Sequence, residues 1–172
     1  QFYTRLPEQQ MHQCSIHSLY YFQNAWKKYR PGEIPLLVFN EGPDISPVYP
    51  GAMDEERSAA HRIRCSVMMA AYGSNHQMAW ATSIDQSGGE NHCSGGFLDN
   101  EVTRNPELSY AAFATHTRHT RDALFESFTN PGSFSAYCAN FRNHKTGRLM
   151  RILWNIRGTR EFLVDAAPGT LQ

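Results

Sequence analysis

The stretch Pro35–Asp44, PLLVFNEGPD, runs from five apolar residues directly into Asn40 and Glu41 and then breaks at Gly42-Pro43. A short, continuous apolar run is typical of a strand that is buried on both faces, as in parallel sheets. A carboxylate at the end of such a strand is costly to bury unless it has a partner or a task. The stretch therefore predicts a parallel strand over residues 35–39 that ends in a paired or functional glutamate.

Helical patterns flank this strand on both sides. Apolar residues recur every three to four positions from His12 to Arg30 and stop at Pro31-Gly32, which predicts a one-sided helix. After the strand, Asp54-Glu55-Glu56 place carboxylates where they complement the dipole of a second helix, and Gly73 is placed to end it. The apolar residues expected to form the buried face of this second helix are Ala59, Ala60, Ile63, Val67, Ala70 and Ala71.

A second short apolar segment, Gln77–Thr82 (QMAWAT), predicts another parallel strand. A long polar loop that contains SGGENHCSGG follows it. Asn105 and Pro106 then suit the cap and the first position of a third helix, which we expect to run to about Asp122. Strands that alternate with helices predict an α/β fold with a parallel sheet.

The pattern changes after residue 125. Apolar and polar residues alternate over 134–141, HKTG at His144–Gly147 predicts a turn, and a further strand is expected over 149–154. A second turn at Arg157–Thr159 leads into a predicted strand over 161–164. We therefore predict two domains: an α/β domain over 1–125 and an antiparallel β module over 126–172.

Composition excludes some classes of partner. The 172 residues include 16 basic and 16 acidic ones, and no basic stripe occurs, so neither nucleic acid nor an acidic membrane is an expected partner. No run of 18 apolar residues predicts a membrane-spanning helix. The sequence leaves a secreted, a periplasmic and a cytoplasmic location open.

Three side chains lie at, near or just after the ends of the two predicted strands. Glu41 stands at the carboxyl end of the first strand, the edge on which open α/β sheets and barrels build their sites. Trp80 lies near the end of the second strand, where its indole could stack on a sugar ring, and Asp85 after it could bind hydroxyl groups. The structural alternatives are a glutamate that caps a helix or pairs with an arginine, a core tryptophan and a loop-shaping aspartate.

The histidines and cysteines do not complete a recognised metal site. His116 and His119 are three positions apart on a predicted helix, and His92 lies beside Cys93, yet no third ligand has the right spacing. We expect solvent-facing histidines and no metal or other cofactor. The four cysteines lack C-x-x-C spacing and are expected to be free, buried thiols, with two disulfides as the alternative.

The order of these segments resembles the C-terminal part of clan A glycoside hydrolases, the retaining TIM-barrel enzymes. LVFNEG is similar to the end of the seventh barrel strand, which carries the nucleophile in the pattern V-T-E-x-G, so the resemblance implies this role for Glu41. Trp80 matches the tryptophan that lines the sugar subsite on the eighth strand, and Asn40 stands where threonine or serine is usual. PELSYAAFATHTR resembles the helix that closes the barrel, and GRLMRILWNIRG the β domain that often follows.

The resemblance implies a retaining mechanism in which Glu41 attacks the sugar, Asn40, Trp80 and Asp85 bind it, and a second carboxyl group acts as acid/base. In the family that group follows an asparagine on the fourth strand, and no second Asn-Glu pair ends a strand of this chain. A whole barrel takes about 250 residues. We therefore expect the C-terminal portion of a (β/α)8 barrel, followed by a small β module, with the rest of the same enzyme as its partner.

Two other functions stay open from the sequence. One is a non-catalytic carbohydrate-binding or interaction protein that keeps the same scaffold. The other is a metal-dependent hydrolase that uses His76, His92 and His116. The preferred sugar, and whether the enzyme cuts within chains or at their ends, are set by loops that the sequence does not interpret.

Overall fold

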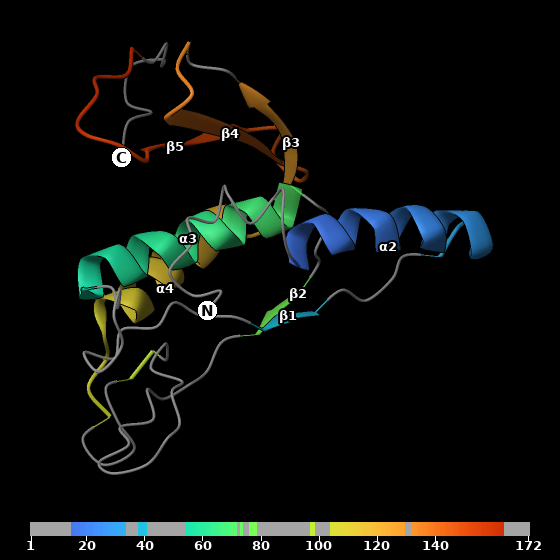
Figure 1. Cartoon of the computed structure of the whole chain (residues 1–172), viewed down its shortest axis with the longest axis horizontal. Coiled ribbons are helices and arrows are strands. Elements are labelled where there is room, and N and C mark those ends of the chain that lie inside the picture. The colour runs from blue at the N-terminus through green and yellow to red at the C-terminus, as the bar shows by residue number, and fades with distance from the viewer. Residues whose placement is uncertain are drawn as a thin grey trace. The chain divides into compact units, whose positions relative to one another are not determined.

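The computed structural model describes residues 15–33, 38–40, 54–71, 73, 76–78, 97–98, 104–129 and 132–163 (Figure 1). Its contacts divide the chain into two units, Gln1–Arg121 and Asp122–Gln172. The first unit contains the elements α2, β1, α3, β2 and α4 in chain order, and the second contains β3, β4 and β5. The alternating order of helix and strand that the sequence predicted for the first unit is confirmed.

The first helix, α2, spans Ser15–Tyr29. Lys27 and Lys28 lie in its last turn, where positive charge complements the carboxyl end of the helix dipole. The chain then turns at Pro31-Gly32, and Gly32 has a φ of 86°, a conformation that glycine adopts without steric cost. The predicted helix and its stop signal are both confirmed.

Local signals also set the bounds of α3, which spans Glu55–Ala71. Asp54 caps its first turn, since Oδ1 of Asp54 accepts a hydrogen bond from the backbone N–H of Arg57 at 2.8 Å. At the other end Gly73 has a φ of 77°, and its N–H donates to the carbonyl of Ala70 at 3.0 Å. A side chain at Gly73 would also meet the amide of Gln23, but this is the end of a flexible side chain that can move, so the positive φ is what favours glycine there.

Two short strands lie side by side and parallel on either side of α3 in the sequence (Figure 1). β1 is Val38–Asn40 and β2 is His76–Met78, with Val38 paired to His76 and Asn40 paired to Met78. The segment β1-α3-β2 is therefore a βαβ unit, in which the helix carries the chain back to start a parallel neighbour. The predicted parallel pair is confirmed, while residues 35–37 and 79–82 of the predicted strands lie outside the described residues.

The third helix, α4, spans Leu108–Thr120, so the start that we expected at Asn105-Pro106 is wrong. Pro106 instead forms an antiparallel β-bridge with Leu98. Glu107 is the N-cap residue, and its side chain makes no capping hydrogen bond. The cap comes from α3, because Oε1 of Glu55 accepts a hydrogen bond from the N–H of Leu108 at 2.6 Å. A partner distant in sequence therefore fixes where α4 begins.

The buried face of α3 is turned relative to the one that the apolar pattern predicted. Ala59 and Val67 are buried as expected, but Ala60 is exposed and Ile63, Ala70 and Ala71 are only half-buried. The reason is that α3 packs against α4 partly through polar contacts, including two hydrogen bonds, so polar residues of α3 share its buried face. The buried residues of α3 are Ser58, Ala59, His61, Arg62, Ser66, Val67, Met68 and Met69.

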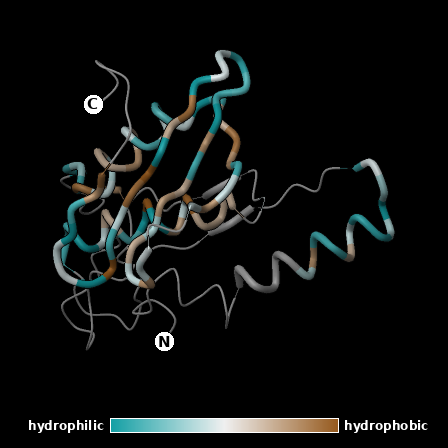
Figure 2. The backbone as a smooth tube through the Cα atoms, turned by 90° about the horizontal axis from the view of Figure 1, so that it is seen from above, coloured by the Kyte–Doolittle hydropathy of each residue, from teal (hydrophilic) through white to brown (hydrophobic). Residues whose placement is uncertain are grey.

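The second unit is an antiparallel sheet of three strands in the order β3-β4-β5. β3 spans Ala123–Thr129, β4 spans Ala136–Asn143 and β5 spans Leu149–Asn155. β4 and β5 confirm the strands predicted over 134–141 and 149–154, but burial does not alternate along β4, where residues 138–141 are buried in succession. Hydrophilic and hydrophobic residues both occur along the described part of the chain (Figure 2).

One strand prediction for this unit is wrong, and one strand was not predicted. Residues 161–163 form no strand, and β3 was not expected from the sequence. Asp122 explains the missed strand: its φ of 62° breaks the helical path directly after α4, so the sheet begins without a connecting loop. Residues 123–125, placed in the first domain by the sequence, thus belong to β3.

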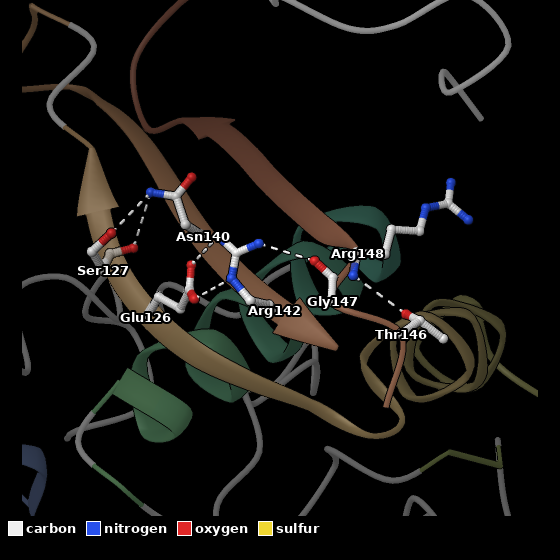
Figure 3. Close-up of polar contacts among 7 residues, drawn as sticks. All are labelled: Glu126, Ser127, Asn140, Arg142, Thr146, Gly147 and Arg148. Carbon is white, nitrogen blue, oxygen red and sulfur yellow. Dashed lines mark hydrogen bonds and ion pairs between the residues drawn. The ribbon is translucent and has the colours of Figure 1, made fainter. Parts of the chain in front are cut away.

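Polar side chains hold the register of this sheet (Figure 3). Arg142 on β4 pairs through Nε and Nη2 with the two carboxylate oxygens of Glu126, which lies at a bulge in β3. Nδ2 of Asn140, which is 7% exposed, donates to Oγ1 of Thr129 at 2.7 Å and lies 3.2 Å from Oγ of Ser127. The predicted turn after β4 is confirmed, since Gly147 has a φ of 71° and its N–H donates to the carbonyl of Asn143 at 2.8 Å.

Glu55→Ala removes the cap of α4 and is expected to lower the unfolding midpoint by about 2–4 °C, because losing an N-cap costs about 1 kcal/mol. Thermal unfolding of the full chain measures the effect. Glu56→Ala is the matched control, since Glu56 lies in the same first turn of α3 and no described hydrogen bond joins it to α4. Equal losses in the two variants would contradict a specific cap.

Candidate functional site

The candidate site begins at the edge where β1 and β2 end. Asn40 and Met78 are the last residues of their strands and pair with each other in the parallel register. Parallel strands that are paired in this way present their carboxyl ends at the same edge of a sheet. The chain continues from this edge directly to Glu41 and, after Ala79, to Trp80.

The structure places only part of the predicted site. Asn40 is described by its backbone, at the end of β1, whereas Glu41, Trp80 and Asp85 lie outside the described residues. His76 is the first residue of β2 and pairs with Val38, so it lies at the amino end of the strand pair, opposite Asn40 and Met78. His92 and Cys93 also lie outside the described residues.

His116 has a structural role that the sequence did not predict. Nε2 of His116 on α4 lies 2.9 Å from Oγ of Ser66 on α3, which joins the two helices by a hydrogen bond. Burial lowers the pKa of His116 from 6.5 to about 4, so the imidazole is neutral at pH 7. The expectation of a solvent-facing His116 is wrong, while His119 on the same helix is exposed.

No group of three histidine, cysteine or acidic side chains that could hold a metal ion occurs among the described residues. Within the same ranges, Cys65 and Cys138 are free thiols, as predicted, and Cys138 is buried. The helices that the structure describes include none that is long and apolar enough to span a membrane.

Arg62 is a buried polar residue of α3, and the apolar pattern of the sequence did not predict its burial. Its guanidinium lies over the ring of Phe97, with 4.7 Å between Cζ and the ring centroid, and the side chain is only 4% exposed. Desolvation lowers the pKa of Arg62, and the charges of Cys65 and Glu107 partly offset this effect. Ser58 and Arg62 are four positions apart in the sequence, so a helix places them on the same face. The structure shows that both residues are buried there.

The comparisons with known proteins add one structural likeness. No model of a known protein family matches the chain, and no curated protein matches it. A solved structure of a family 39 glycoside hydrolase from the gut symbiont Bacteroides cellulosilyticus WH2 is similar, with a TM-score of 0.61 and 14% sequence identity. The similarity covers 81% of this chain but 27% of that one, so the chain spans about a quarter of the length of its structural neighbour. At this identity the likeness concerns the fold alone, a combination of helices and a three-stranded antiparallel sheet.

The half-buried His116 predicts a loss of stability in acid. Its pKa is lower in the folded state than in the unfolded one, so between pH 6.5 and about 4 the unfolded chain binds more protons and stability falls with falling pH. The full effect corresponds to up to about 3 kcal/mol. His116→Gln is expected to flatten this slope in denaturant unfolding measured from pH 7 to pH 4.

The exposed His119 supplies the control for this experiment. His119→Gln on the same helix should leave the acid slope of the wild-type chain in place. The explanation fails if His116→Gln keeps the wild-type slope, or if the two variants flatten it equally.

Proposed function

We propose that this chain carries the nucleophile strand of a retaining glycoside hydrolase and that Glu41 is the nucleophile. The observation that supports this most is the parallel pairing of Asn40 with Met78, because it brings the two strands to one carboxyl edge just before Glu41 and Trp80 in the sequence. Barrel enzymes build their sites on that edge. The likeness to part of a family 39 glycoside hydrolase supports the same class of protein.

The chemistry needs two carboxyl groups about 5–5.5 Å apart. In the proposed mechanism the ionised Glu41 attacks the anomeric carbon, and the bond to the leaving oxygen breaks as that oxygen takes a proton from the second carboxyl group. A covalent glycosyl-enzyme forms, and water then releases the sugar with the second group acting as base. Asn40, Trp80 and Asp85 would bind the sugar, the indole by stacking and the other two by hydrogen bonds to hydroxyl groups.

The second carboxyl group would come from an earlier strand of the barrel. The described residues include two parallel strands, and the similarity covers 27% of the neighbouring glycoside hydrolase. On α2, Tyr21 is 61% exposed and Tyr29 is 72% exposed, as expected for a helix that a further layer covers. We therefore propose that this chain is the C-terminal portion of a (β/α)8 barrel enzyme, with the β3-β4-β5 sheet as its appended β module.

Glu41→Gln is expected to lower kcat on an aryl glycoside by about 10³-fold or more in the enzyme that includes the preceding βα units, because the amide cannot form the glycosyl-enzyme. The 172-residue chain alone should show no turnover. Hydrolysis is measured by release of the aryl group.

Glu33→Gln is a suitable control, because Glu33 is exposed and pairs with Arg30 beyond the end of α2. Wild-type turnover in Glu41→Gln would exclude Glu41 as the nucleophile. Sugar binding without any turnover in the enzyme with all its strands would instead favour a non-catalytic carbohydrate-binding protein.

A further inference from the structure

An aromatic stripe runs along one face of α2 and is open to solvent over much of its length. Phe22, Trp26 and Tyr29 are spaced four and three residues apart, so the helix places them on one face. Phe22 is 45% exposed, Tyr29 is 72% exposed, and the ring centroids of Phe22 and Trp26 lie 5.7 Å apart. Large apolar side chains that gather at a surface in this way mark a contact with another part of a protein.

The opposite side of α2 is polar. Asn24, Lys27 and Lys28 are all exposed. Asn24 follows Phe22 by two residues, or about 200° around the helix axis, so it lies on the far side from the stripe. A helix with one apolar stripe and a polar remainder covers a further layer of the protein with that stripe.

The contact of α2 with the end of α3 uses a different surface of the helix. The amide of Gln23 lies against Gly73, which follows α3. Gln23 comes directly after Phe22, so this contact lies about 100° around the helix from Phe22. The layer that the stripe covers is therefore not α3.

The order of the elements indicates which layer this is. α2 leads into β1, and α3 then leads from β1 to its parallel neighbour β2. In the part of the sheet that the structure describes, β2 pairs with one edge of β1, and the other edge is open. A crossover helix packs on the two parallel strands that it joins. A strand that precedes α2 and pairs with the open edge of β1 would therefore also lie under the stripe.

We propose that the aromatic stripe on α2 and the open edge of β1 together receive one parallel β-strand from the βα unit that precedes α2, an inference that rests on the proposed barrel. One strand accounts for both features, because its backbone pairs with β1 while the side chains of one face pack against Phe22, Trp26 and Tyr29. Burial on both faces requires a strand that is apolar throughout. The structural neighbour agrees with such a strand, since the similarity covers 27% of that protein and the rest has no counterpart in this chain.

Cysteine labelling tests this contact without reference to catalysis. Phe22→Cys and Asn24→Cys are each prepared in the 172-residue chain and in the enzyme that includes the preceding βα units, and alkylation by iodoacetamide is quantified on the peptide that contains the substitution. Phe22→Cys is expected to react about 10-fold or more slowly in the longer enzyme, because a covered thiol reacts only when the structure opens locally. Asn24→Cys, on the polar side, should react at the same rate in both lengths.

Two additions keep the test decisive. If Phe22→Cys prevents folding of the longer enzyme, Ala25→Cys replaces it, because Ala25 is exposed one turn along on the side of Phe22 and the change in volume is small. Equal rates in the two lengths would overturn the proposal. Protection in the short chain that increases with protein concentration would also overturn it, since a second copy would then cover the stripe.

The outcome for the stripe is separable from the outcome for Glu41. Protection of Phe22→Cys in a longer enzyme that hydrolyses no glycoside would support the strand contact and contradict the catalytic role of Glu41. Hydrolysis without protection would contradict the strand contact alone.

Discussion

The parallel pairing of β1 with β2 is the constraint on which the candidate site depends. Because Val38 pairs with His76 and Asn40 with Met78, the chain must cross back over the sheet between the two strands, and α3 provides that crossover. Both strands then end at one edge, just before Glu41 and Trp80 in the sequence. The sheet that β1 and β2 form within the described residues has two strands, whereas parallel sheets are usually larger and covered on both faces. This agrees with the proposal that the pair belongs to a barrel.

Polar contacts set how α3 and α4 pack together. Glu55 caps α4 from the first turn of α3, Ser66 bonds to His116 in the middle of the contact, and Arg62 lies over Phe97. Hydrogen bonds and cation–π contacts between specific atoms fix one register, whereas apolar contacts alone tolerate sliding. Titration at this contact should therefore change the stability of the fold, because His116 is held neutral there.

Local signals were predictable from the sequence, and distant partners were not. The turn at Pro31-Gly32, the acidic first turn of α3 at Glu55-Glu56 and the stop at Gly73 each follow from a few adjacent residues, and the structure confirms them. The start of α4 was predicted wrongly, because its cap is Glu55, which is far away in sequence. β3 was missed because the left-handed conformation of Asp122 joins helix to strand without a loop signal. For the site, the sequence predicted the strand pair and its edge, but the roles of Glu41, Trp80 and Asp85 rest on family resemblance and on chemistry still to be measured.

The central claim is that Glu41 becomes covalently bonded to sugar. The most direct measurement is to incubate the enzyme that includes the preceding βα units with an activated 2-deoxy-2-fluoroglycoside, digest it and locate the label by mass spectrometry. The account predicts one sugar per chain on the peptide that contains PLLVFNEG, with the bond at Glu41. A label on another carboxylate, or turnover of a natural glycoside without any covalent adduct, would contradict it.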